Sequence, residues 1–128
     1  SSAAAAQERV VLCGHCPVHP GVVNDLDALA WDCSEVLEVI ERAGRGCVAA
    51  YFAGHDHAGG YVRDGATGVH HLTVPSPLEA PPSTGSRYLL VDLCSGGLRL
   101  AGVGGVPLEP GRRTTCRLCG GGAPFVCG

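Results

Sequence analysis

Two apolar, strand-like segments flank one helical segment, and this arrangement constrains the fold more than any other feature of the chain. Residues 9–13, RVVLC, form a short apolar run before a glycine, which predicts a buried strand. Residues 47–53, CVAAYFA, predict a second buried strand that ends at Gly54. Because a helix lies between the two strands, the pattern predicts a parallel pair joined by a helical crossover.

The helix is predicted over residues 32–43, DCSEVLEVIERA. Asp32 or Ser34 can cap its start and Gly44 can end it. Its predicted apolar stripe consists of Val36, Leu37, Val39 and Ile40.

The second half of the chain predicts hairpins. Residues 61–74 contain two strand-like runs separated by the turn residues 64–68, and residues 87–103 repeat the pattern around 95–97. The Gly-rich segment 109–128 has little periodicity and is expected to be mostly irregular. The fold class is therefore α/β, with a mixed sheet, one main helix and trailing hairpins.

Composition excludes some partners. The formal charge of −3 gives no basic footprint for nucleic acid or for an anionic membrane surface, and no apolar run is long enough to span a bilayer. The first eight residues lack the features of a signal peptide, so we expect a reducing, cytoplasmic location for the eight cysteines. The abundance of Ala, Gly, Val, Pro and Arg suits a GC-rich coding sequence, and together with the absence of Met it leads us to expect a piece of a longer protein. A processed mature chain is the alternative.

The segment CGHC, residues 13–16, invites two thiol interpretations. A redox pair is disfavoured, because Pro17 and Pro20 follow at once and a thioredoxin-like pair sits at a helix N-terminus. A four-cysteine zinc site built with the second CxxC pair, residues 116–119, and Cys127 is also disfavoured, because the pairs lie far outside the spacing of a zinc ribbon.

The histidines support a third interpretation. His15 follows the first strand and its glycine, whereas His55 and His57 follow the second. The carboxyl ends of parallel strands share one sheet edge, so these three imidazoles are expected to converge. Two residues apart in an extended segment, His55 and His57 can face one way. Imidazole suits Mn, Fe or Zn, and Asp56 can hold a ring N–H or a neighbouring backbone group.

In addition, the chain contains an ordered set of motifs: HxPxHP, LAWDCSEVLEVI, AGHDHAGGY, GVHHLTV, EAPP and a closing hairpin near GGVP. This set resembles the manganese-dependent ADP-ribose/CDP-alcohol diphosphatases, which are calcineurin-like metallophosphoesterases. The likeness covers roughly residues 9–108. It implies a divalent metal cofactor, Mn²⁺, in a dinuclear centre, and hydrolysis of the phosphoanhydride of a small nucleoside diphosphate derivative such as ADP-ribose or a CDP-alcohol.

The resemblance also implies roles for individual residues. His15 and His55 match ligands of the second metal, and His57 matches a ligand of the first metal that also touches the attacking water. Cys16 and His19 match positions near the substrate pocket. Many family members have Ser where Gly14 stands, a difference not expected to disturb ligation.

The family's earlier motifs, Asp-x-His, GDxxD and GNH, do not occur in this sequence. We therefore expect a partial, C-terminal half of a metallophosphoesterase βαβ sandwich, with residues 1–8 as a linker remnant, 9–108 as the partial domain and 109–128 as a tail. Such a chain needs its N-terminal half for activity and is expected to be inactive alone. The alternative is a non-enzymatic metal-binding remnant or interaction module.

Overall fold

The computed structural model describes residues 2–6, 8–83, 85–94, 97–108 and 115–118. Its described helices are α1 (Ser2–Ala5) and α2 (Cys33–Arg42), with short 3-10 helices at Pro20–Val22, Leu26–Ala28 and Pro77–Glu79. Its described strands are β1 (Val10–Cys13), β2 (Val48–Ala53), β3 (Gly60–Arg63), β4 (His70–Thr73), β5 (Tyr88–Cys94), β6 (Gly97–Val103) and β7 (Thr115–Leu118). None of the described helices has the length and apolar character needed to cross a membrane.

Four strands form a mixed sheet in the order β1-β2-β4-β3. β1 and β4 both pair with β2 in parallel, and β3 pairs with β4 antiparallel. The predicted crossover is confirmed, since α2 connects the parallel strands β1 and β2. The mixed α/β fold class with one main helix is likewise confirmed.

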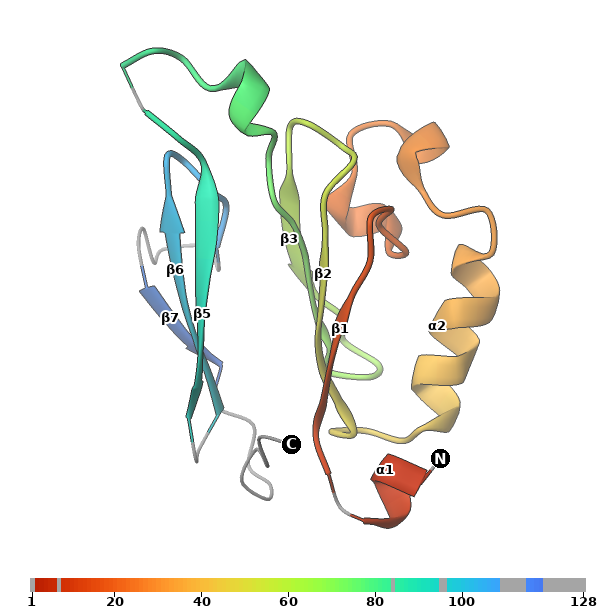
Figure 1. Ribbon diagram of the computed structural model, residues 1–128. Helices are drawn as coiled ribbons and strands as arrows, with labels where there is room; N and C mark the ends of the chain where they lie inside the picture. Colours follow the sequence, from red (N-terminus) through yellow and green to blue (C-terminus); the bar gives the residue numbers. More distant parts are fainter. Residues whose placement is uncertain (1, 7, 84, 95–96, 109–114, 119–128) are drawn as a thin grey trace.

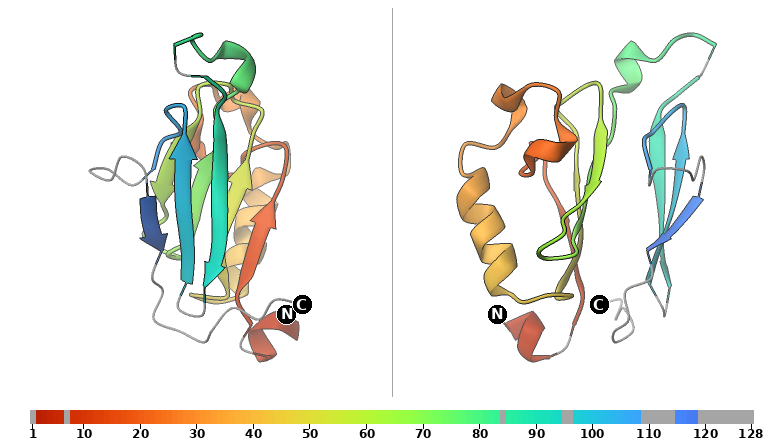
Figure 2. Two further views of the ribbon diagram at one scale, coloured as in Figure 1. Left: turned by 60° about the vertical axis from the view of Figure 1, so that its left-hand side comes forward. Right: turned by 180° about the vertical axis from the view of Figure 1, so that it is seen from behind.

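α2 covers one face of this sheet, and a second, antiparallel sheet covers the other (Figure 1). The second sheet has the order β5-β6-β7, and the view from behind shows the same three layers (Figure 2). The predicted hairpins are β3–β4 and β5–β6. Segment 109–128 was expected to be mostly irregular, but residues 115–118 form β7 because they pair with β6. The rest of this segment lies outside the described residues.

Two hydrophobic clusters hold the layers together. Between the two sheets, Phe52 and Leu72 of the first sheet pack with Leu98 and Leu100 of the second. Under the helix, Ile40 of α2 packs with Val48 and Val69, and Val36 and Leu37 border this cluster. Burying these apolar side chains is the main free-energy gain that fixes the layers.

Two details of the predicted elements are corrected. β1 was expected to be buried, but its residues are only partly buried and Cys13 is exposed, because β1 forms a sheet edge. Val39 was placed in the apolar stripe but is 57% exposed, because Ile40 is the residue that faces the sheet. Asp32 occupies the N-cap position without a side-chain hydrogen bond, and Gly44 follows the C-cap with a φ of 88° that favours glycine.

A close approach of the chain to β3 brings the loop after β1 against the sheet. A Cβ on Gly60 would stand 2.8 Å from backbone atoms of Val22, so only glycine leaves room for this contact. Val22 is buried as a result. The loop that carries Cys16 and His19 is thereby held near the carboxyl ends of β1 and β2.

Candidate metal and substrate site

The carboxyl ends of β1 and β2 carry the predicted ligands. The strands run parallel with Cys13 opposite Phe52, so the loops that follow them leave the same edge. The N–H of Gly54 donates to the carbonyl of His15 at 3.0 Å and ties the two loops together. The sheet register therefore brings His15 and His55 to one place.

His15 and His55 form the centre of the site. Nδ1 of His55 lies 3.1 Å from Nε2 of His15, and the ring centroids are 4.9 Å apart. Two ligands held about 2.1 Å from one cation at right angles stand about 3 Å apart, so this pair fits two neighbouring positions around one divalent ion. The two exposed imidazoles supply no negative charge.

His57 lines the same cavity but points to a different partner. This cavity, of about 320 Å³, is lined by His15, Gly54, His55, His57, Val74, Pro75, Ser76 and Pro77. Nδ1 of His57 lies 2.7 Å from Oε1 of Glu79, in the Pro77–Glu79 turn. Across the described part of the chain, no three His, Cys, Asp or Glu side chains gather as a possible metal cluster. The expected convergence is therefore seen for two rings and not for the third.

The backbone at His55 explains this difference. Residues 55–58 form a bend and a turn, not the extended segment assumed from the sequence. His55 has a φ of 65°, and the N–H of Asp56 donates to the carbonyl of Gly54 at 2.8 Å. A three-residue turn with a positive φ is strained for a non-glycine residue, and such strain concentrates at functional sites. Because the turn replaces an extended segment, the side-chain alternation that would align His55 with His57 is lost.

Asp56 anchors this turn. The carboxylate accepts the N–H of Asn24 at 2.6 Å and the N–H of Ala58 at 3.0 Å, so it holds backbone groups, one of the two expected roles. Burial raises the pKa of Asp56, but these hydrogen bonds outweigh it, and the pKa lies below its ordinary value. The anchor therefore stays ionised at neutral pH and joins the loop after β1 to the His55 turn.

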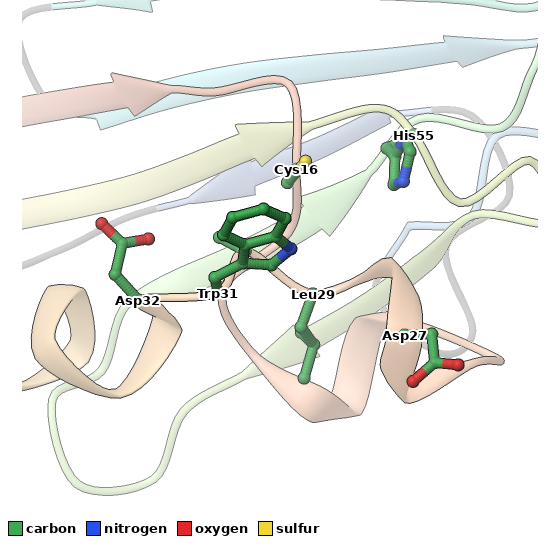
Figure 3. A pocket seen from close by; sticks show the side chains of 7 residues that line it. Cys16, Asp27, Leu29, Trp31, Asp32 and His55 are labelled. Carbon is green, nitrogen blue, oxygen red and sulfur yellow. The ribbon is translucent and has the colours of Figure 1, made fainter.

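Cys16 and His19 were both placed near the substrate pocket, and the structure separates them. Cys16 lines a second cavity of about 540 Å³, and His55 borders this cavity as well as the first (Figure 3). His19 caps the Pro20–Val22 turn by accepting the N–H of Gly21, and its ring lies 4.8 Å from that of His71. The cavity beside His19 is lined by other residues, from α2 and the β3–β4 turn.

The first two cysteines lie at the end of β1 and in the loop that follows it. Cys13 and Cys16 are free thiols, and no α-helix begins directly after them, since the next element is the 3-10 turn Pro20–Val22. The pair therefore does not lie at the start of an α-helix, and its predicted lack of redox activity stays a prediction. Cys119 and Cys127, and the side chain of Cys116, lie outside the described residues, so the prediction against a four-cysteine zinc site stays a prediction.

A side chain at position 14 would disturb the site more than the family resemblance implied. A Cβ at this position would collide with the hydroxyl of Tyr51, which donates to the carbonyl of Cys16 at 3.1 Å. A Ser at this position would therefore displace Tyr51 from the loop that carries His15.

Sequence reasoning gave no role to two residues of the site. Glu79 lies in the motif EAPP and contacts His57. The sequence feature that could have pointed to this residue is a carboxylate within a proline-rich loop. Trp31 is the sole tryptophan of the chain and lines the second cavity. The sequence segment before α2 gave no indication that this ring would be solvent-exposed.

Comparisons with known proteins agree with the motif resemblance. The chain is 44% identical over 82 residues to a manganese-dependent ADP-ribose/CDP-alcohol diphosphatase from Oryza sativa, covering 64% of the chain and 24% of that protein. Proteins of the same name from Arabidopsis thaliana and Homo sapiens are 39% and 35% identical, covering 76% and 79% of the chain and 30% and 28% of those proteins. No family model matches the chain.

The structural comparison gives the same result. A crystal structure of a dimetal phosphatase from Danio rerio superimposes with a TM-score of 0.69 and 34% identity, covering 77% of the chain and 30% of that protein. The chain thus spans about a quarter to a third of the length of these relatives.

Proposed function

Because the chain is similar over most of its length to part of the manganese-dependent ADP-ribose/CDP-alcohol diphosphatases, we propose that it supplies one part of a metal-dependent site that hydrolyses nucleoside diphosphate derivatives. The observation that carries this proposal is the pair His15 and His55, whose ring nitrogens face each other at 3.1 Å at the ends of adjacent parallel strands. Residues 9–108 would form the phosphoesterase part, flanked by a linker at 1–8 and a tail at 109–128.

In this proposal His15 and His55 hold one divalent cation, Mn²⁺ by analogy with the relatives. His57 donates Nδ1–H to Glu79, which leaves Nε2 free to face the cavity as a further ligand and to orient the attacking water. Asp56 keeps the turn in place through Asn24 and Ala58. When bound, a pair of divalent cations polarises the phosphoryl oxygens and lowers the pKa of a bound water.

The charge of the site supports the proposal that this chain holds only part of a two-metal centre. Neutral imidazoles do not offset two dications, and carboxylates usually bridge them. Among the described residues no further carboxylate joins His15 and His55. We propose that the bridging carboxylates and the Asn-His motif of the family come from protein outside this sequence.

The proposal is tested by complementation. The chain is assayed with Mn²⁺ on ADP-ribose and CDP-choline, alone and fused behind the part of the rice relative that it does not cover. The chain alone is expected to be inactive and the fusion active. His15→Ala or His55→Ala in the fusion should lower kcat/KM by about a hundredfold or more, whereas His70→Ala, a histidine of the β3–β4 hairpin, should change it little.

Circular dichroism spectra of all variants establish that they are folded. A folded but inactive fusion, or equal activity of the His55→Ala and His70→Ala fusions, would contradict the proposed ligands. Metal-dependent hydrolysis by the isolated chain would contradict the need for outside carboxylates.

A further inference from the structure

Trp31 is exposed to an unusual degree for a large aromatic side chain. Its relative exposure is 104%, so the faces of the indole are free of contacts in the folded chain. It stands between the Leu26–Ala28 turn and the start of α2. A single exposed apolar residue is ordinary, so its meaning depends on what surrounds it.

The loop that presents Trp31 is held in place. The N–H of Ala30 donates to the carbonyl of Pro17 at 2.9 Å, and the N–H of Cys33 donates to the carbonyl of Ala30 at 3.0 Å. The first bond ties the Trp31 loop to the segment that carries His15 and Cys16. The backbone that carries the indole is therefore held beside the site, so binding of a flat ligand has to order only the indole side chain itself.

The cavity beside the indole has a mixed lining that suits an uncharged ring with polar edges. Besides Trp31 it is lined by Cys16, Asp27, Leu29, Ala30, Asp32 and His55. Figure 3 shows the indole in the middle of these side chains, between Cys16 and Leu29. The lining contains no Lys or Arg, and its two carboxylates would repel a phosphate but accept hydrogen bonds from an amine or a hydroxyl.

The cavity and the proposed metal site share one lining residue. His55 borders both this cavity and the smaller one that contains His15 and His57. A ligand with a phosphate at the histidines and a planar ring on Trp31 would span the two cavities. Nucleoside phosphates have this shape, with a flat base at one end and anionic oxygens at the other.

We propose that Trp31 is the platform on which the nucleobase of the substrate stacks, and that it gives the site its preference for nucleoside over non-nucleoside phosphates. The inference rests on the proposed function and deepens it by naming a specificity-determining residue. Aromatic stacking of this kind accepts either a purine or a pyrimidine, because each has a π-face, and losing it weakens binding by about ten- to a hundredfold.

Because Trp31 is the sole tryptophan, its fluorescence reports directly on the proposed contact. The full chain is titrated in EDTA, without metal, with AMP, CMP and ribose 5-phosphate, and absorption by the nucleotides is corrected with free N-acetyltryptophanamide. AMP and CMP are expected to quench the emission with saturation, and ribose 5-phosphate is not. Quenching that is equal for ribose 5-phosphate, or no saturable quenching by any nucleotide, would overturn the proposal.

Variants are compared by equilibrium dialysis with radiolabelled AMP. Trp31→Ala should bind about ten- to a hundredfold more weakly, and Trp31→Phe should retain most of the affinity because a stacking face remains. Leu78→Ala is the matched control, since Leu78 is an 88% exposed apolar residue outside this cavity and its removal should not alter binding. Unchanged binding by folded Trp31→Ala would refute the role of the indole.

The measurement also separates this inference from the proposed function. His15→Ala and His55→Ala remove the proposed ligands but leave the indole in place. If complementation fails to yield hydrolysis while base-dependent quenching persists in these variants, the phosphoesterase assignment is wrong and the nucleobase platform stands. If hydrolysis is restored but Trp31→Ala leaves kcat/KM for ADP-ribose unchanged, the platform is wrong and the phosphoesterase assignment stands.

Discussion

Gly14 and Tyr51 show how one side chain restricts the residue allowed at a neighbouring position. The Tyr51 hydroxyl occupies the space that a Cβ on Gly14 would need, and it donates to the carbonyl of Cys16. Burial, followed by the nearby groups of Cys16 and Asp32, raises the pKa of Tyr51, so the phenol stays protonated and continues to donate. The position of the loop that carries His15 therefore depends on this pair.

We predict that Gly14→Ala lowers the free energy of unfolding by about 1–3 kcal/mol, because the added methyl group overpacks the site. Tyr51→Phe in the same chain should recover part of this loss, since removing the hydroxyl makes room. Urea unfolding of the single and double variants measures the coupling. Gly65→Ala is the control, because nothing lies within 4 Å of a Cβ there; additive effects of the two substitutions would argue against the collision.

The contact between His57 and Glu79 sets which ring nitrogen is free. A carboxylate only accepts hydrogen bonds, so Nδ1 of a neutral His57 carries the proton and Nε2 remains available. Both side chains are more than half exposed, so the pair adds little to stability. Its effect is on orientation and tautomer.

Glu79→Gln is therefore expected to leave the Tm within about 2 °C of wild type, as for an exposed pair. It should, however, shift His57 toward the Nε2–H tautomer that an isolated histidine side chain prefers. Long-range ¹H–¹⁵N spectra of the labelled, metal-free chain at pH 8 distinguish the two tautomers. Glu79→Asp should partly restore the wild-type spectrum, and Glu38→Gln on α2 serves as the control. An unaltered His57 spectrum in Glu79→Gln would show that the carboxylate does not select the tautomer.

At the scale of elements, α2 is attached to the sheet through one side of its surface. Ile40 is 3% exposed and packs on Val48 and Val69, whereas its neighbour Val39 is 57% exposed. The helix has ten residues and lacks a side-chain hydrogen bond at its N-cap. A helix this short depends on tertiary packing for its stability.

Ile40→Ala is thus predicted to lower the free energy of unfolding by about 2–5 kcal/mol, because it leaves a cavity under the helix. Val39→Ala, a similar truncation one residue earlier, should cost less than about 1 kcal/mol. Chemical denaturation followed by circular dichroism compares the two. Equal losses for both variants would contradict the packing of α2 described above.

At the scale of the whole molecule, a buried histidine links stability to pH. His71 is fully buried, and neither ring nitrogen has a hydrogen-bond partner among the described residues. Its ring is tilted against that of His19 and stacked with that of Tyr51. Burial, followed by the charge of His19, lowers the pKa of His71 to about 4, while Asp64 opposes this shift.

The sign of the pH effect follows from this shift. Below about pH 6.5 the unfolded chain binds a proton at His71, but the folded chain does not until about pH 4. The free energy of unfolding should therefore fall by up to about 3 kcal/mol between these two values and be unaffected by His71 above them. Asp56 and Asp64, whose pKa values are lowered, lose their contribution only at more acid pH.

His71→Leu is expected to reduce the loss of stability between pH 6.5 and pH 4, because it removes the group that the unfolded chain protonates. Thermal unfolding of both proteins across this range gives the difference directly. A loss of stability with the same dependence on pH in both would place the titrating group elsewhere.

Much of the architecture could be predicted from the sequence, because the signals are local. Apolar runs that end in glycine mark β1 and β2, the spacing of Val36, Leu37 and Ile40 marks the buried side of α2, and turn residues mark the hairpins. Parallel pairing of β1 with β2 follows from the crossover between them. The meeting of His15 and His55 at one sheet edge was likewise predictable, since both follow strands of that pair.

The tertiary structure alone decided the features that depend on contacts between distant residues. The positive φ of His55 separates it from His57, and Glu79, 22 residues away, then binds the His57 ring. The packing of the β5–β7 sheet on the first sheet joins residues that no local periodicity relates. A pattern of residue types reports which faces are apolar, whereas φ angles and side-chain partners result from how the whole chain packs. The separation of the cavity at the histidines from the cavity beside Trp31 could therefore be seen only after folding.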